Sequence, residues 1–288
     1  HMGLWMPWTH THFEGKMVDF WNVGDGTGTV RFAKYLSTTD GPVFGGFQVQ
    51  QEHVARKTSK GEQVVYEQSV EEFVEVLKNC PTVCDLDGDK QEELVLQTFS
   101  GGAHCCFSYL VFSLGDTPAL MARLEARDSG AMIKEADGDG IAEFHAADMA
   151  FDYFGASHAS SVHPPSVLLY QNWSFHLAAH LMRKPAPAEA EWQKRVDSVR
   201  ADWDNKEVMG MTFEDEEWGK APPSLWGNML DLISSGNGEL AWKFLDELWP
   251  AGKPGKDAFR KDFEAQLGKS DYYDDVLKLN GWEKTKQE

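Results

Sequence analysis

The sequence predicts an α+β protein in which a strand-rich N-terminal part is followed by a small helical C-terminal unit. Two observations predict this class. Short runs of β-branched and aromatic residues, separated by Gly, Asp and Thr clusters, dominate the chain up to about residue 182. Apolar residues at helical spacing dominate the part after residue 188. We therefore expect a β-rich domain at 4–182 and a helical domain at 189–288, joined through a Pro-Ala-Pro-Ala linker at 185–188.

The β-rich part contains several candidate strands and one candidate antiparallel hairpin. The candidate strands are 30–36, 44–50, 63–66, 119–126, 143–150 and 166–170. The hairpin joins 93–99 to 105–114 through a glycine-containing turn. One segment, 69–77, is predicted as a short helix, because Ser69 and Glu72 have the spacing of a capping box.

Four amphipathic segments predict the helical unit. Their apolar positions are more typical of a core than of a cofactor site. The segments are marked by Trp192, Val196, Val199 and Trp203; by Leu225, Met229 and Leu232; by residues 240–249; and by Phe259, Phe263 and Leu267.

The formal net charge of −19 limits the partners that the protein can bind. Nucleic acid and anionic membrane surfaces are disfavoured because binding them requires clustered Lys and Arg. A basic protein partner or a hard cation fits better, although the charge is also compatible with a role in solubility alone. No apolar run approaches the roughly 18 residues that span a bilayer, so we expect no membrane insertion of the mature chain.

All four cysteines lie in a short stretch, at Cys80, Cys84, Cys105 and Cys106. An even number in one stretch favours disulfides and an oxidising, periplasmic or otherwise exported location; four buried thiols are the alternative. The first residues resemble a cloning scar, so we expect the signal segment to be missing. In a simple hairpin Cys84 and Cys105 would lie about 20 Å apart, which favours the local pairs Cys80–Cys84 and Cys105–Cys106. If the segment is not a simple hairpin, disulfides between the two local pairs, such as Cys84–Cys105, become possible again.

The most informative stretch is an acidic loop that begins at Asp85. Acidic residues occupy positions one, three, five and nine of this loop, and a glycine at position four lets it turn tightly. Calcium takes six to eight oxygen ligands, which alternating carboxylates and one backbone carbonyl can supply. The predicted ligands are Asp85, Asp87, Asp89, Glu93 and the carbonyl of Gln91. The alternative is a solvated acidic turn without a cation.

The same pattern recurs fifty residues later, with Glu in place of Asp at position one. The corresponding predicted ligands are Glu135, Asp137, Asp139, Glu143 and the carbonyl of Ile141. A repeat at this spacing indicates two copies of one strand-rich unit.

Both loops resemble the Asp-x-Asp-Gly-Asp-x-x-x-Glu-Leu loops of FG-GAP (integrin α-like, VCBS-like) repeats. The resemblance covers about residues 75–180 and implies calcium bound between strands of β-propeller blades. Two repeats are too few for a seven-bladed propeller, so open antiparallel sheets or a smaller, propeller-like arrangement are expected. The segment 99–106 also resembles a stretch found after such loops in bacterial envelope proteins of unassigned role.

No Gly-x-Ser-x-Gly elbow, His-Glu-x-x-His motif, phosphate loop or dinucleotide-binding glycine pattern occurs in the sequence. We therefore expect a calcium-stabilised, non-enzymatic envelope protein that binds a protein partner; one version is an immunity protein that neutralises a toxin. The alternatives are a periplasmic hydrolase, using residues such as His158, Ser160 and His163, and a purely structural module.

Overall fold

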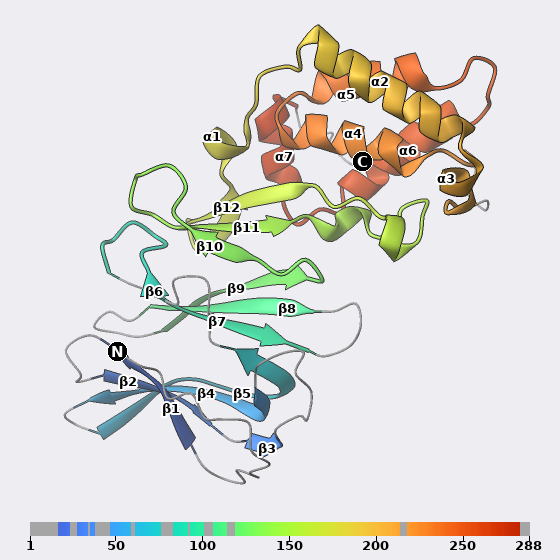
Figure 1. The fold of residues 1–288 in the computed structure, drawn as a ribbon. Helices are drawn as coiled ribbons and strands as arrows, with labels where there is room; N and C mark the ends of the chain where they lie inside the picture. The colour runs from blue at the N-terminus through green and yellow to red at the C-terminus, as the bar shows by residue number, and fades with distance from the viewer. Residues whose placement is uncertain are drawn as a thin grey trace, which may run out of the picture. The chain divides into compact units, whose positions relative to one another are not determined.

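The computed structural model describes residues 17–23, 28–33, 35–37, 47–58, 61–75, 83–91, 93–100, 106–113, 119–213 and 218–282 (Figure 1). The chain forms two compact units. The described residues up to Glu143, with Tyr170–Phe175, make the first unit, and Phe144–Leu169 with the described residues from His176 onward make the second. Antiparallel sheets precede a run of helices, as the predicted α+β class requires.

The first unit is built on an antiparallel sheet of nine strands. Nearly every residue is buried in β7 (Glu93–Phe99) and β8 (Phe107–Ser113), as expected for strands covered on both faces. The path through the sheet is β1 (Met17–Val23), β2 (Gly28–Ala33), β4 (Phe47–Thr58), β5 (Gly61–Glu75), β7 (Glu93–Phe99), β8 (Phe107–Ser113) and β9 (Ala119–Arg127); β3 (Tyr35–Ser37) pairs with β4, and β6 (Val83–Cys84) pairs with β7.

The predicted hairpin is confirmed. Strands β7 and β8 pair antiparallel without a register shift, from Glu93 opposite Ser113 to Phe99 opposite Phe107. The strand predicted at 119–126 is also confirmed as β9, which pairs with the other edge of β8. This arrangement places Glu93, the last predicted ligand of the first loop, at the start of a buried strand.

The helix predicted at 69–77 is wrong over its described part. Residues up to Glu75 continue strand β5, which pairs with β4 on one side and with β7 on the other. Val74 lies opposite Phe47, and Phe73 lies opposite Phe99. These two ladders satisfy the backbone groups that a helix would satisfy locally, so tertiary pairing overrides the capping-box signal.

A second sheet follows, with the order β10 (Met132–Lys134), β11 (Glu143–Ala147), β12 (Pro165–Gln171) and β13 (Ser174–Leu177). The strand predicted at 143–150 ends early, because Asp148 accepts a hydrogen bond from Ala150 N at 2.9 Å and caps the short helix η1 (Met149–Phe151). Strands β12 and β13 are joined by Asn172 and Trp173, both with positive φ, which is the conformation of a type I′ turn.

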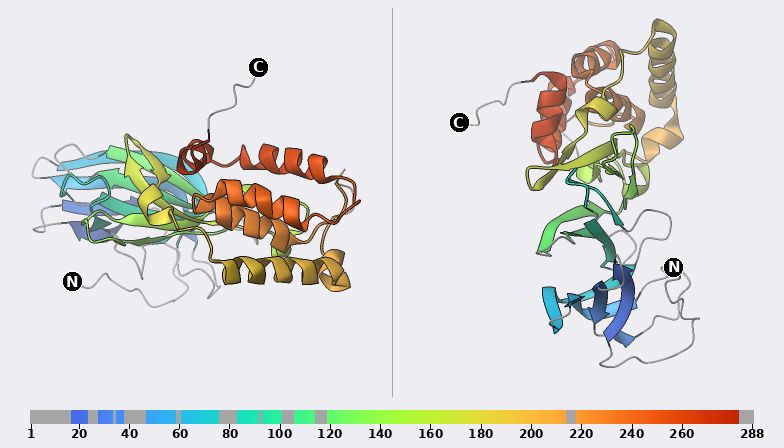
Figure 2. Two further views of the ribbon diagram at one scale, coloured as in Figure 1. Left: turned by 90° about the horizontal axis from the view of Figure 1, so that it is seen from above. Right: turned by 90° about the vertical axis from the view of Figure 1, so that its left-hand side faces the viewer.

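Helices dominate the second unit (Figures 1 and 2). Helices α2 (Glu189–Asp204), α4 (Pro223–Ser234) and α5 (Gly238–Leu248) contact one another, and α4 also contacts α7 (Tyr273–Asn280). The four amphipathic segments predicted from sequence are confirmed as α2, α4, α5 and α6. The bounds are η2 (His158–Ser160), α1 (Ala179–Met182), α2 (Glu189–Asp204), α3 (Lys206–Gly210), α4 (Pro223–Ser234), α5 (Gly238–Leu248), α6 (Lys256–Leu267) and α7 (Tyr273–Asn280).

The core of the second unit is aromatic. Phe154 packs edge-on against Trp226 and Phe259, with ring centroids 5.7 and 6.1 Å apart. Trp226, Phe259 and Phe263 have no exposed surface, and the burial of Phe259 and Phe263 agrees with their prediction as core residues. None of the helices that the structure describes is both long and apolar enough to cross a lipid bilayer.

Asp275 holds α7 against β13. Its carboxylate lies 2.9 Å from His176 Nδ1 and accepts hydrogen bonds from Leu177 N at 3.2 Å and Lys278 Nζ at 2.9 Å. Burial alone would raise the pKa of Asp275, but the hydrogen bonds from Lys278, His176 and Leu177 outweigh burial and lower it below 3.8. The ionised carboxylate therefore stabilises the folded state.

Asp275→Asn is expected to lower the free energy of unfolding by about 1–2 kcal/mol at pH 7. Because the folded-state pKa of Asp275 is lowered, its contribution is present above about pH 4 and is lost as the pH falls through the folded-state value. Urea unfolding at a series of pH values measures this. A difference between variant and wild type that stays constant from pH 7 to pH 2.5 would contradict the assignment.

Candidate metal centre

The first acidic loop (85–93) connects β6 to β7. Asp85 accepts hydrogen bonds from Gly88 N at 2.7 Å and from Lys90 N at 2.9 Å. Asp87 and Asp89 each accept from the backbone N–H two residues ahead. These Asx-type bonds fold the loop so that carboxylate oxygens of Asp85, Asp87 and Asp89 lie within 4.8 Å of one another.

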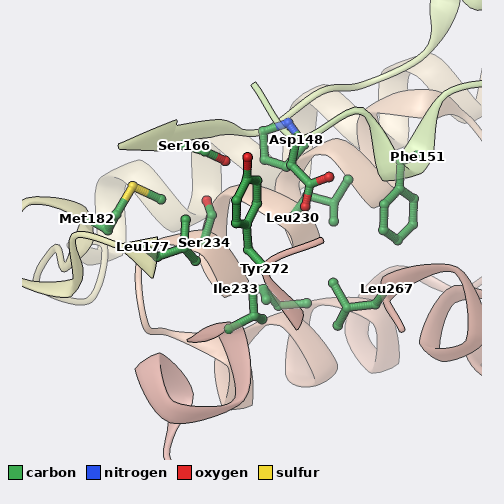
Figure 3. A pocket seen from close by; sticks show the side chains of 12 residues that line it. Asp148, Phe151, Ser166, Leu177, Met182, Leu230, Ile233, Ser234, Leu267 and Tyr272 are labelled. Atoms are coloured by element: carbon green, nitrogen blue, oxygen red, sulfur yellow. The ribbon is translucent and has the colours of Figure 1, made fainter. Parts of the chain in front are cut away.

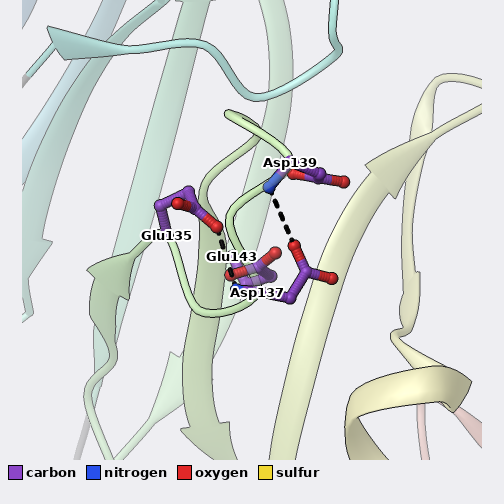
Figure 4. Close-up of side chains that lie close together, drawn as sticks. All are labelled: Glu135, Asp137, Asp139 and Glu143. Carbon is purple, nitrogen blue, oxygen red and sulfur yellow. Dashed lines mark hydrogen bonds between the residues drawn. The ribbon is translucent and has the colours of Figure 1, made fainter.

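The second acidic loop (135–143) connects β10 to β11 and gathers one more acid (Figure 4). Carboxylate oxygens of Glu135, Asp137, Asp139 and Glu143 all lie within 4.8 Å of one another. The longer Glu135 side chain at position one reaches the same backbone donors as an Asp would, since its Oε1 accepts from Asp137 N and Gly138 N. The structure therefore brings together all four predicted carboxylates of this loop.

The two loops share one hydrogen-bond pattern. In each loop, four acidic side chains accept hydrogen bonds from backbone N–H groups. The acid at position nine accepts from the N–H of position two, and the acid at position one accepts from the N–H of position four. The acids at positions three and five each accept from the N–H two residues ahead. Positions four and six have positive φ in both loops. The residues at those positions are Gly88 and Lys90 in the first loop, and Gly138 and Gly140 in the second.

Gly88→Ala and Gly138→Ala are expected to lower the free energy of unfolding by about 1 kcal/mol each, because alanine is strained at positive φ. Of the two variants, Gly88→Ala should lower the free energy of unfolding more. A Cβ at Gly88 would lie 3.0 Å from Ile141 Cδ1, whereas nothing lies within 4 Å of a Cβ at Gly138. Urea denaturation of both variants, with the metal removed, measures the difference. Equal costs would contradict the close approach of the two loops.

The closing acids of both loops are buried. Glu93 is 2% exposed and Glu143 has no exposed surface. Burial, and to a smaller extent the charges of the neighbouring aspartates, raise the pKa of Glu93 to about 7 against the lowering effect of the Leu86 N–H. The pKa of Glu143 is raised for the same reasons, with burial the largest. A bound cation would remove this penalty by stabilising the ionised carboxylates.

Only one of the two carboxylate oxygens of Glu143 accepts a hydrogen bond from the described residues. Its Oε2 accepts a hydrogen bond from Ala136 N at 2.9 Å. Its buried Oε1 has no hydrogen-bond donor among the residues that the structure describes. A buried carboxylate oxygen without a partner is costly, and the other acids of the loop add repulsion instead of compensation. The second loop could therefore hold a cation.

A separate polar cluster lies in the second unit, around Asp152. Asp152 Oδ1 lies 2.8 Å from His158 Nδ1 and 3.4 Å from His163 Nε2. Ser160, the third residue considered for a hydrolase triad, directs its Oγ to Met211 Sδ at 3.5 Å. The structure thus pairs an acid with His158 but turns Ser160 toward Met211.

A small cavity also lies in the second unit (Figure 3). Its lining is mostly apolar and includes Met182, Leu230 and Leu267; the polar lining residues are Asp148, Ser166, Ser234 and Tyr272. Its volume of about 20 Å³ is enough for roughly one water molecule, which is far below the space that an organic substrate needs.

The cysteines are described in part. Cys106 is disulfide-bonded, and Cys84 keeps a thiol on β6, opposite Glu93. The predicted local pair Cys80–Cys84 is therefore not formed. Cys80 and Cys105 lie outside the described residues, so the identity of the bonded partner of Cys106 remains a prediction.

Sequence spacing identified the acids of both loops but not the contact between them. Ala142 N donates a hydrogen bond to Asp85 O at 2.9 Å, which joins the two loops directly. Ala142 is an ordinary apolar residue in the sequence, and its backbone donor carries no signal there. The predicted carbonyl ligands, those of Gln91 and Ile141, remain predictions.

Together, the sheets, the helices and the paired loops define an α+β protein with two adjacent acidic sites suited to a cation. Residues 1–83 match the model of DUF6807, a family of unknown function. This match covers less than half of the chain and ends before the first acidic loop. No curated protein and no solved structure gives a significant match.

Proposed function

We propose that the protein binds calcium at the two acidic loops and that calcium stabilises the first unit. The observation that supports this most strongly is Glu143, a fully buried carboxylate whose Oε1 has no donor among the described residues. Three further acids direct oxygens to within 4.8 Å of it. A cation at this point would supply the missing partner and offset the repulsion between the acids.

Calcium fits this ligand chemistry better than other common metals. The groups gathered in each loop are carboxylates, and the predicted extra ligands are backbone carbonyls, so all the donors are hard oxygens. Zinc and copper sites normally include His or Cys. Magnesium demands near-ideal octahedral geometry and retains several waters, whereas calcium accepts six to eight oxygens in irregular geometry.

Calorimetric titration of the chelated protein with calcium and, separately, with magnesium tests the proposal. We expect calcium binding with a dissociation constant at least about tenfold below that of magnesium. Asp139→Asn, which keeps a side-chain acceptor for Ile141 N, should weaken binding to the second loop. Absence of calcium binding to the folded wild-type protein would refute the proposal.

The proposed architecture is a pair of FG-GAP-like units in open antiparallel sheets. Each unit consists of a short strand, an acidic loop and a buried strand: β6, loop and β7 in one, and β10, loop and β11 in the other. The shared hydrogen-bond pattern and the matching positive-φ positions support this correspondence. Calcium would then stabilise the connection between successive strands.

The biological role that we propose is non-enzymatic binding of a protein partner in the bacterial envelope, with neutralisation of a toxin as one version. The net charge of −19 favours a basic partner. Trp173 supplies a candidate contact, because it is 83% exposed at the β12–β13 turn and adopts a φ of 66°, where glycine is normally preferred.

A pull-down from a native envelope extract tests the partner. Wild-type protein should recover a stoichiometric partner that Trp173→Gly does not recover. Met132→Ser is the matched control, since Met132 is also exposed, at 54%. Recovery of the same partner by both variants would exclude Trp173 as the contact, and recovery of no partner by wild type would argue against the binding role.

A hydrolase is the second candidate, supported by the 2.8 Å contact between Asp152 and His158, in which the acid would orient the imidazole as a general base. A screen with ester and amide substrates, with His158→Gln as the control, tests it. Activity that is lost in His158→Gln would favour the hydrolase, whereas equal or absent activity would count against it.

A further inference from the structure

The two acidic loops are joined by a single peptide group, the one between Asp85 and Leu86. Its carbonyl, Asp85 O, accepts a hydrogen bond from Ala142 N at 2.9 Å. Its N–H, on Leu86, donates to Glu93 Oε2 at 2.8 Å. Ala142 directly precedes Glu143, so this peptide connects the closing acid of one loop with the closing acid of the other.

Side-chain packing reinforces this connection. Ile141 packs against Gly88, where a Cβ would lie 3.0 Å from Ile141 Cδ1. Leu86 and Ala142, the residues that provide the two donors, are 0% and 4% exposed. The contact is therefore dry, and a displacement of either loop would break a buried hydrogen bond.

We propose that the two loops form one coupled two-cation unit, in which a calcium ion in either loop raises the affinity of the other loop for calcium. This inference rests on the proposed function. A cation held by Asp85, Asp87 and Asp89 fixes Asp85, whose own carbonyl belongs to the shared peptide. The fixed peptide positions Ala142, and with it Glu143, before the second ion arrives, so less ordering remains for the second binding step.

Electrostatic repulsion opposes this coupling. Both loops are rich in acidic residues, and a cation in one loop reduces the negative potential that attracts a cation to the other. At about 0.15 M salt the Debye length is about 8 Å, so repulsion through solvent is partly screened while the buried hydrogen bonds are not. The coupling should therefore increase when the salt concentration is raised from about 0.02 to about 0.5 M.

Calcium titration calorimetry on the full chain tests the coupling with three proteins: wild type, Asp87→Asn and Asp137→Asn. Each substitution neutralises position three of one loop, and the asparagine keeps an oxygen to accept the N–H two residues ahead. The two variants give the single-loop association constants. We expect the overall two-site constant of wild type to exceed the product of these constants by a factor of at least about five.

Ile141→Ala is the variant that targets the contact itself. It removes the side chain packed on Gly88 but no carboxylate and no backbone carbonyl, so both loops should still bind calcium, with a coupling factor closer to one. A coupling factor of one or less in wild type, or an unchanged factor in Ile141→Ala, would overturn the inference while leaving calcium binding intact. A complete lack of binding in wild type would instead refute the proposed function.

Discussion

Removal of calcium is expected to lower the melting temperature of the first unit by roughly 5–10 °C for each site that is emptied. At a calcium concentration about one hundred times the dissociation constant, one site adds about 2.7 kcal/mol of stability. For a unit of this size, each kcal/mol corresponds to about 2–4 °C. The buried acids Glu93 and Glu143 are the physical source, since both carry a raised pKa that a cation would reverse. Differential scanning calorimetry in EDTA and in about 1 mM calcium measures the shift.

Two controls sharpen this prediction. Asp137→Asn should lose a large part of the shift, because the second loop no longer gathers four carboxylates. Glu189→Gln should retain it, because Glu189 is an exposed acid at the start of α2. A shift of the same size in Asp137→Asn, or no shift in wild type, would be inconsistent with calcium binding at these loops.

The metal-free protein is expected to lose stability as the pH rises from about 5 to about 8. Burial raises the pKa of Glu93 from 4.5 to about 7 in the folded state. Between these values the folded state binds a proton that the unfolded state has released, so stability falls with increasing pH. The loss from Glu93 is at most about 3 kcal/mol, and Glu143 adds to it in the same direction. This direction is opposite to that expected for Asp275.

Glu93→Gln separates the destabilising effect of the buried charge in the metal-free protein from its stabilising effect when calcium is bound. Glutamine keeps an acceptor for Leu86 N but carries no charge, so the variant should be more stable than wild type in EDTA at pH 8. In calcium the order should reverse if Glu93 is a ligand, as the sequence predicts, because the variant lacks its charge. Urea unfolding under both conditions, with Glu189→Gln as the control, gives the comparison. A variant that is less stable than wild type in both conditions would show that Glu93 is only structural.

Local patterns predicted much of the fold. The helices α2, α4, α5 and α6 follow from apolar residues at helical spacing; Val196 and Val199 of α2, for example, are fully buried. The β7–β8 hairpin follows from two apolar runs around a glycine-containing turn. In each case the signal lies within one or two neighbouring segments, so it is readable from the sequence.

Features that depend on distant partners were not predictable in this way. The residues after Ser69 have the local pattern of a capped helix, yet pairing with β4 and β7 makes them a strand. The short helix α7 was missed because its buried residues Val276, Leu277 and Leu279 span barely one turn. Its position depends on Asp275 and the distant His176.

In the candidate site, too, some features follow from the local sequence and others depend on distant residues. Spacing identified the carboxylates that the structure brings together. These are Asp85, Asp87 and Asp89 in the first loop, without the predicted Glu93, and all four predicted acids in the second loop. Spacing did not reveal that Glu143 is fully buried with one oxygen unpaired among the described residues, or that Ala142 bonds to Asp85. Both facts depend on how the second loop packs against the first.

Equilibrium dialysis against calcium at pH 7.5, followed by measurement of the metal content, tests the central claim most directly. We predict about two calcium ions per chain for wild type and about one for Glu143→Gln, with both proteins folded by circular dichroism. A wild-type protein that retains no calcium above the level of the dialysis buffer would contradict the claim that these loops are calcium sites.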